Sequence, residues 1–428
     1  MDFLQVPTRC RRFDGFRIQH MKKRVITLSA AALAVVGSQA ADGKIWEVSA
    51  TLKGFYDDNV TTAPSNEIES GGIEFSPALS LNYGNGTDLD ISAGYAYGLR
   101  WYDDRPTDDQ DHGHELGLSL DKAFTDTSRL SLSESYVVAQ EPALLDGGTP
   151  LRLEGDNTRN TFQAGYKRIL SGKTGVEVGY GNSIFDYDDS TFSSLLDRQV
   201  NSFNVDGFYY LDEQTELVLG YKFAASDFDG PEVSREGLLS FDPDARDNDS
   251  HFAYLGLNRN VNSQLAVEAL VGIQTADFDN ADRMPDVVTD DDPSSPYADV
   301  RFTWSYAEDS SIVGGVMMLR TATDLRAADQ ETTAIYAQLT HRFTDLSPDL
   351  YGTITGRFQT SELNGGGNGI DGKDEELNLF GLGLSYNISE SLWAEISYNY
   401  DELESDVRVY GDRSFDRNYL SFGIGARY

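Results

Sequence analysis

The chain ends in YLSFGIGARY, Tyr419 to Tyr428, where apolar side chains alternate with small or polar ones. The apolar set is Leu420, Phe422, Ile424, Ala426 and Tyr428, and the intervening set is Tyr419, Ser421, Gly423, Gly425 and Arg427. Because successive side chains of a strand point to opposite faces, the pattern predicts a β-strand with one apolar face. A terminal strand of this kind needs an apolar environment, which the lipid around a membrane barrel provides.

The same alternation recurs upstream, between short polar turns and longer acidic connections. The clearest strand runs from Leu89 to Arg100, directly after a tight turn at residues 84–87. Short turns follow at 126–128, 171–173, 212–214, 262–264, 308–310, 345–348 and 389–391, and long connections at 142–158, 228–249, 279–295, 362–375 and 405–416. Short turns on one rim and long loops on the other are typical of outer-membrane barrels. We therefore predict an all-β fold, a transmembrane antiparallel up-and-down β-barrel of about 18 strands, with roughly 16 to 18 compatible with the pattern.

Alternation alone also fits a soluble β-sandwich or a propeller. Uniformly apolar faces, aromatic residues at the strand ends and the terminal strand together favour the membrane barrel. One residue departs from the pattern, because Glu134 stands with Leu130, Leu132 and Tyr136 on the predicted lipid face. A β-bulge or a short barrel wall would each explain this glutamate, and the sequence leaves both open.

Residues 21–40, MKKRVITLSAAALAVVGSQA, have the features of a secretory signal peptide. Basic residues precede a short apolar stretch, and Ser38-Gln39-Ala40 is a small-x-small cleavage site. The apolar stretch is shorter than the about 20 residues that a membrane-spanning helix needs. We expect cleavage after Ala40 and a single barrel domain over residues 41–428. Residues 1–20 have the features of neither a signal nor a barrel, and we expect a misassigned N-terminal extension with Met21 as the true start.

The expected mature chain is strongly acidic. Residues 1–40 hold seven of the 34 Lys and Arg residues and two of the 70 Asp and Glu residues, which leaves a net charge of −41 on residues 41–428. This charge argues against nucleic acid as a partner. The single cysteine, Cys10, precedes the mature region, so disulfides and thiolate metal sites are excluded there.

Two short motifs lie close to the ends of the predicted barrel. Tyr56-Asp57-Asp58-Asn59-Val60 ends the first strand, and Asp416-Arg417-Asn418 opens the last one. With these motifs the chain resembles the outer-membrane β-barrel porins of Gram-negative bacteria, of the type often encoded near exopolysaccharide genes. The resemblance implies a barrel architecture over the whole mature chain. It transfers little chemistry, because that group is defined mainly by its fold.

Acidic residues gather where strands enter the long loops, next to aromatic residues. Examples are Asp57-Asp58, Asp103-Asp104 and Asp188-Asp189. The structural interpretation is an aromatic belt at the membrane interface with solvated charge beyond it. The functional interpretation is a layer of divalent cations that bridges these carboxylates to lipopolysaccharide phosphates, or a vestibule that attracts cations.

Three further motifs invite a chemical interpretation. Loop 242–249, DPDARDND, hints at calcium but lacks the glycine and the late glutamate of a calcium loop. The glycine-rich stretch 364–369 is expected to be a flexible loop and not a phosphate cradle. His112 and His114 stand near several acidic residues in what we expect to be an external loop, where a rim enzyme or a metal site competes with an ordinary polar loop. We predict no catalytic, cofactor or metal site and no enzymatic activity.

Charges of both signs occupy the predicted inner faces of the strands. The candidate pore-lining residues are Glu47, Lys53, Asp90, Arg100, Glu177, Lys222, Glu268, Asp299, Arg301, Arg342 and Glu395. In a wide barrel such residues pair across the wall or line a watery pore. We expect a porin-like channel in the outer membrane for small polar solutes or a polysaccharide. The alternative is a closed surface-structural barrel or a rim enzyme.

The surroundings of such a barrel follow from its location. We expect contact with outer-membrane lipid and lipopolysaccharide, and assembly by the outer-membrane insertion machinery. The acidic mouth should favour cations most strongly at low salt, and the inward arginines should oppose this preference.

The terminal strand yields the first prediction, with Phe422 and Tyr428 as the insertion signal. Deleting Tyr428, or changing Phe422 to Asp, should impair insertion, because each change removes part of the aromatic and lipid-facing pattern. Heat-modifiable, protease-resistant barrel should decrease in the outer membrane of both variants. Normal amounts of folded barrel in both would contradict this role.

Overall fold

Eighteen strands close into one antiparallel barrel in the computed structural model of the chain. The structure describes residues 45–84, 88–106, 108–139, 143–144, 150–151, 156–188, 190–232, 241–367, 369–409 and 411–428. Each barrel strand pairs with the next one along the chain, and the last strand pairs with the first. The predicted fold class is therefore confirmed. The expected signal peptide, the extension before it, Cys10 and Asp189 lie outside the described residues.

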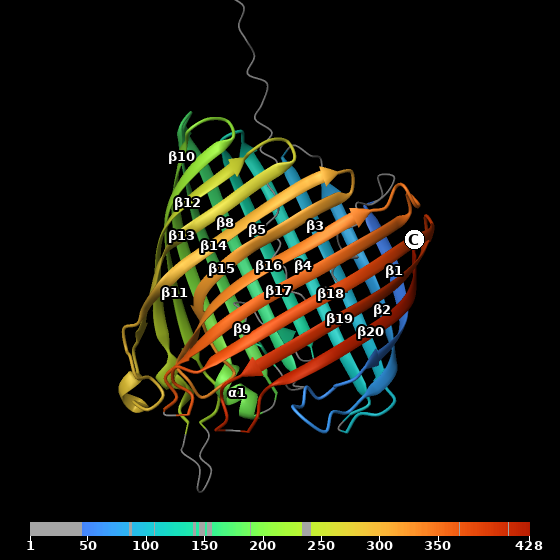
Figure 1. The fold of residues 1–428 in the computed structure, drawn as a ribbon. Coiled ribbons are helices and arrows are strands. Elements are labelled where there is room, and N and C mark those ends of the chain that lie inside the picture. The colour runs from blue at the N-terminus through green and yellow to red at the C-terminus, as the bar shows by residue number, and fades with distance from the viewer. Residues whose placement is uncertain are drawn as a thin grey trace, which may run out of the picture.

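The strands are long enough to cross a bilayer at the tilt visible in Figure 1. They are β1 Trp46–Asp57, β2 Ser70–Gly84, β3 Leu89–Tyr102, β4 Gln110–Thr125, β5 Ser128–Ala139, β8 Asn157–Ser171, β9 Thr174–Tyr187, β10 Arg198–Tyr210, β11 Thr215–Phe228, β12 Asn248–Asn260, β13 Leu265–Phe278, β14 Ser294–Ala307, β15 Ser310–Thr321, β16 Asp329–Arg342, β17 Leu350–Asn364, β18 Asp374–Ser389, β19 Leu392–Ser405 and β20 Phe415–Arg427.

The two rims of the barrel differ. Short turns and the C-terminus lie at one end of the barrel, at the top and right of Figure 1, and the longer connections lie at the other, toward the bottom. The long connections carry helix α1 Ser190–Leu196, the 3₁₀ turns η4 Pro243–Arg246 and η5 Ala281–Arg283, and a small hairpin of β6 Ala143–Leu144 with β7 Pro150–Leu151. No helix in the described part of the chain is long and apolar enough to cross a membrane.

Alternation gives the barrel an apolar outer face and a more polar inner face. On β20, Leu420, Phe422 and Ile424 are exposed on the outside, whereas Ser421 is buried on the inside. On β14, Phe302 and Trp304 are likewise exposed. The outward side chains would meet hydrocarbon in a bilayer, as the periodicity predicts.

Glu134 occupies the outer face without any local irregularity. The ladder between β4 and β5 stays in register there, with Glu134 opposite Leu118. A bulge at this residue is therefore excluded. Asn160 of the next strand donates a hydrogen bond to the Glu134 carboxylate, which satisfies part of its hydrogen-bonding capacity.

Buried apolar clusters lie on the inner wall of β10 to β12, around Phe208 and Phe252, and at the long-loop end of the barrel. One cluster joins Phe241, Ala245, Met284, Val287 and Ala328 with neighbouring residues, and it draws on several different connections. A second cluster combines Leu325, Ala327, Leu363, Ile370 and Val407. The loops therefore pack on one another as a small soluble core would.

The two short motifs, Tyr56 to Val60 and Asp416 to Asn418, meet across the seam between β1 and β20. Arg417 Nε lies 2.9 Å from Asp57 Oδ2, and both side chains are buried. Asn418 donates to both carboxylate oxygens of Asp58, at 2.6 and 2.8 Å, and Asn59 donates to the Asp416 carbonyl at 2.8 Å. The interpretation of Asp57 as a solvated rim charge is therefore wrong, because the arginine 360 residues later pairs with it.

This seam gives the second prediction. Replacing Arg417 with Met leaves Asp57 buried without its ionic partner, which should lower the free energy of unfolding by about 3–5 kcal/mol. The matched control is Arg427→Met on the same strand, where the arginine donates to the Glu390 carbonyl near the surface. Urea titrations followed by heat-modifiable migration measure both. Equal losses of stability in the two variants would show that the seam pair has no special importance.

Candidate pore and its constriction

The predicted pore-lining residues all stand on the inner faces of their strands, alternating with the lipid-facing side chains. Several of them form pairs. Lys53 Nζ lies 2.8 Å from Glu395 Oε1, and Arg342 Nη1 lies 3.0 Å from Asp309 Oδ2. Glu47, Asp90, Glu177 and Asp299 lie on other parts of this inner wall, and their role as a pore lining remains a prediction.

Other predicted residues meet partners that the sequence did not single out. Arg100 Nη2 lies 2.7 Å from Glu74 Oε2. Lys222 Nζ lies 5.0 Å from the centre of the Phe252 ring. Glu268 and Arg301 stand opposite each other in the ladder between β13 and β14. The inner wall therefore carries charged side chains of both signs together with aromatic rings.

The end of β15 leaves the barrel wall and enters the interior. Its pairing with β14 stops at Met318, while residues 319–321 pair with β16 alone. Gln274 on the inner face of β13, two strands away, binds the backbone of Arg320 through both ends of its amide, at 2.9 and 3.3 Å. We name residues 319–329 the inward segment, because this contact requires that part of the chain to lie inside the barrel.

Arg246 holds the inward segment from one side. Its guanidinium donates to the carbonyls of Thr323 and Ala328 in the segment and of Leu195 in α1, at 2.7–3.2 Å. The side chain is fully buried and packs over the Phe228 ring. Burial, together with the nearby charge of Arg198, lowers the pKa of Arg246 to about 9, so it stays cationic at neutral pH.

Arg413, in the connection between β19 and β20, also holds the inward segment. It donates to Asp324 of the segment at 2.8 Å and to Glu375 at 2.9 Å, and all three side chains are buried. Burial opposes its charged form, but the two carboxylates outweigh that effect and raise the pKa of Arg413. Arg320 and Asp329, at the ends of the segment, form a bidentate pair with both distances at 2.8 Å.

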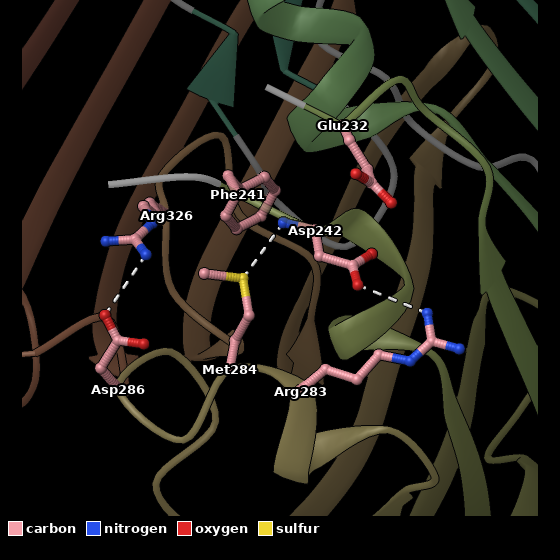
Figure 2. A pocket seen from close by; sticks show the side chains of 7 residues that line it. All are labelled: Glu232, Phe241, Asp242, Arg283, Met284, Asp286 and Arg326. Carbon is pink, nitrogen blue, oxygen red and sulfur yellow. Dashed lines mark hydrogen bonds and ion pairs between the residues drawn. The ribbon is translucent and has the colours of Figure 1, made fainter. Parts of the chain in front are cut away.

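A cavity lies among the long connections, and Figure 2 shows its lining. It measures about 340 Å³ and is bordered by Glu232, Phe241, Met284 and several charged residues. Both arginines of its lining are paired with carboxylates. Arg283 contacts Asp242 and Asp244, and Arg326 contacts Asp286.

These pairs also bear on the acidic loop motif at residues 242–249. Three of the four aspartates of stretch 242–249 are engaged, because Asp242 and Asp244 face Arg283 and Asp247 accepts from the Phe228 amide at 2.7 Å. Among the described residues no group of three or more acidic, histidine or cysteine side chains could hold a metal ion.

The glycine-rich stretch 364–369 is a packed turn and not the free loop that we expected. The Gly366 amide donates to Val287 at 3.0 Å, and the Gly365 amide to Asp371 at 2.7 Å. Gly365 has a φ of +77°, and a Cβ there would come within 1.8 Å of the Val287 carbonyl. Residue 368 lies outside the described part.

The expectation that His112 and His114 lie in an external loop is wrong. Both are part of β4 and point outward, where Tyr97 Oη lies 2.7 Å from His112 Nδ1 and Tyr95 Oη 2.9 Å from His114 Nδ1. The period-two sequence His112-Gly113-His114, which continues into Leu116 and Leu118, carried this signal. Nearby acidic residues obscured it.

No family model and no curated protein matches the chain. Among solved structures, the outer membrane protein opdK of Pseudomonas aeruginosa is 13% identical over 90% of this chain and 99% of its own, with a TM-score of 0.44. OccK2 (OpdF) of the same organism, solved in complex with glucuronate, is 12% identical over 89% and 98%, with a TM-score of 0.46. OccAB3 of Acinetobacter baumannii is 11% identical over 90% and 99%, with a TM-score of 0.43. The fold assignment for this chain rests on its own strand pairing.

The ion pairs of Arg413 with Asp324 and Glu375, which hold the inward segment, give the third prediction. Arg413→Met leaves Asp324 and Glu375 buried without their cation, which should ease local opening of the segment by about 3–5 kcal/mol. Hydrogen exchange at the amides of residues 319–329 measures this change. Arg408→Met is the control, since Arg408 in the same connection is exposed and forms a surface pair with Asp412, a kind of pair worth at most about 1 kcal/mol. Unchanged exchange in Arg413→Met would show that Arg413 does not hold the inward segment in place.

Proposed function

We propose that this protein is a porin-like channel of the bacterial outer membrane that passes small polar solutes. The observation that carries the proposal is a closed 18-stranded barrel with an apolar outside and a charged inside. Barrels of about 16 to 18 strands are wide enough to leave an aqueous channel. A polar lumen of that width is suited to conducting water and solutes.

The inward segment supports small solutes over a polysaccharide. It lies inside the barrel and is held by Arg246 and Arg413. A loop packed inside a barrel narrows the path, as a selectivity constriction does. The exopolysaccharide connection therefore has no support from this geometry.

The other candidate functions have weaker support. The rim-enzyme alternative depended on an acid–histidine group in a loop, and those histidines lie on the lipid face of β4. A closed structural barrel is the remaining competitor, and conductance separates it from a channel. Contacts with lipopolysaccharide, divalent cations and the insertion machinery belong to the same proposal through the outer-membrane location.

The fourth prediction tests conduction directly. Gly98 on the inner face of β3 and Gly356 on the outer face of β17 both face open space, because a Cβ added at either would meet no heavy atom within 4 Å. Gly98→Trp should narrow the lumen and lower the single-channel conductance of the refolded protein in planar bilayers. Gly356→Trp should leave conductance unchanged, because its indole would face lipid.

The outcomes separate the hypotheses. Conductance steps that shrink only in Gly98→Trp support a channel through the barrel. Absence of steps from folded wild-type protein would overturn the channel proposal and favour a closed structural barrel. Equal effects of the two tryptophans would place the ion path outside the lumen.

A further inference from the structure

Four polar side chains form a row on the outer face of β5, β8, β9 and β10. They are Glu134, Asn160, Asn182 and Asn201, and we name them the outer polar row. Strand pairing places Glu134 and Asn182 on either side of Phe162, and it places Asn201 directly opposite Asn182. All four residues therefore share the face of the wall that would meet lipid.

Two members of the row lie inside the apolar band of the barrel and not at its edge. Glu134 stands midway along β5, with a leucine and a tyrosine on the same face two residues away on either side. Asn182 stands on β9 between Tyr180 and Ile184, which are both exposed on the outside. A carboxylate or an amide that faces hydrocarbon costs free energy, so such side chains usually face other protein.

Hydrogen bonds within the row satisfy only part of its polar groups. Asn160 donates to the Glu134 carboxylate. Asn201 Oδ1 accepts from Asn182 Nδ2 at 3.0 Å and from Tyr180 Oη at 2.9 Å. An asparagine side chain offers two N–H donors and an acceptor oxygen. Among the described residues, Asn201 therefore keeps both N–H groups for a further partner, and Asn160 and Asn182 each keep one N–H and the oxygen.

The remaining donors and acceptors complement one another between two copies of the row. Asn160 and Asn201 each stand three residues from the loop end of their strands, and Asn182 stands on the strand between them. A two-fold axis along the membrane normal near Asn182 keeps both barrels upright and exchanges the two flanking strands. It brings the Asn160 oxygen of one copy opposite the Asn201 N–H groups of the other. A basic partner would match Glu134 alone, whereas a second copy matches all three amides.

We infer that the outer polar row is a contact surface between two copies of this chain, docked side by side in the membrane about a two-fold axis near Asn182. Each copy shields the polar groups of the other from lipid, and the amides form hydrogen bonds across the contact. Each barrel stays closed and keeps its own lumen. The inference rests on the membrane location of the barrel and not on conduction.

Disulfide cross-linking in isolated outer membranes tests this contact. Cys10→Ser is included in every variant, so that the introduced cysteine is the only one in the chain. Asn182→Cys, near the axis, should give a covalent dimer on a non-reducing gel after oxidation with copper phenanthroline. Asn378→Cys is the matched control and should stay monomeric. Asn378 lies on the outer face of β18, halfway round the barrel from β9, and is two residues from Glu376 at the edge of the apolar band.

Two further sets of variants test the amide contacts. In Asn182→Cys protein, Asn160→Leu together with Asn201→Leu should lower the dimer yield about tenfold or more, because hydrogen bonds across the contact are lost. Asn378→Leu in the same protein should leave the yield unchanged. The double variant Asn160→Cys/Asn201→Cys should cross-link on its own, which keeps the contact testable where Asn182→Cys folds poorly. Heat-modifiable migration confirms that each variant has folded.

The outcomes distinguish this inference from the channel proposal. A covalent dimer from Asn182→Cys that the two leucines suppress supports the contact surface. No dimer from the folded cysteine variants, or equal yields from Asn182→Cys and Asn378→Cys, would overturn it. A yield that the leucines leave unchanged would overturn the role of the amides. Conductance steps from protein that gives no dimer would leave the channel proposal intact while this inference fails.

Discussion

Closure of β20 onto β1 is the constraint on which the whole barrel depends. Every other neighbouring pair of barrel strands is joined by a local connection, whereas this seam joins residues from opposite ends of the chain, from Ser49 with Arg427 to Asp57 with Tyr419. An open edge would leave a row of backbone donors and acceptors in hydrocarbon, at several kcal/mol for each unsatisfied group. The buried pair of Asp57 and Arg417 fixes the register at the loop end of the seam, and the tyrosine at the C-terminus continues the ladder at the other end.

In a closed barrel of this size, apolar side chains are distributed differently from those of a protein with a single interior core. Lipid takes the outer apolar side chains, so much of the strand sequence needs no interior partner. Much of the compact packing lies where the long connections meet, and three buried arginines there have defined partners. Arg246 binds carbonyls, Arg320 binds Asp329, and Arg413 bridges Asp324 and Glu375. These contacts offset the cost of burying charge and hold the inward segment in the lumen.

The strand pattern was predictable because it depends on a local rule. Period-two alternation assigns each residue to a face, and one face must be apolar in lipid, so Leu89 to Arg100 and the terminal strand could be assigned without tertiary information. His112 and His114 obeyed the same rule, and the error arose from giving weight to nearby acids. The inward segment had no such signal. Its contacts join residues 46 to 89 positions apart, such as Gln274 with Arg320 and Asp324 with Arg413, and no local pattern encodes them. Arg246 could have been singled out from the sequence, because it is the only basic residue in the acidic stretch 242–249.

Net charge is therefore a poor guide to the potential inside this barrel. Many acids are already neutralised by neighbours, as Asp57, Asp324 and Asp329 are, and others lie at the rims where water and salt screen them. A cation buried beside a narrow cavity acts at short range in a medium of lower effective dielectric, where one charge is worth several solvated ones. The potential beside the inward segment is therefore determined mainly by the few cations next to it, and less by the acidic exterior of the protein.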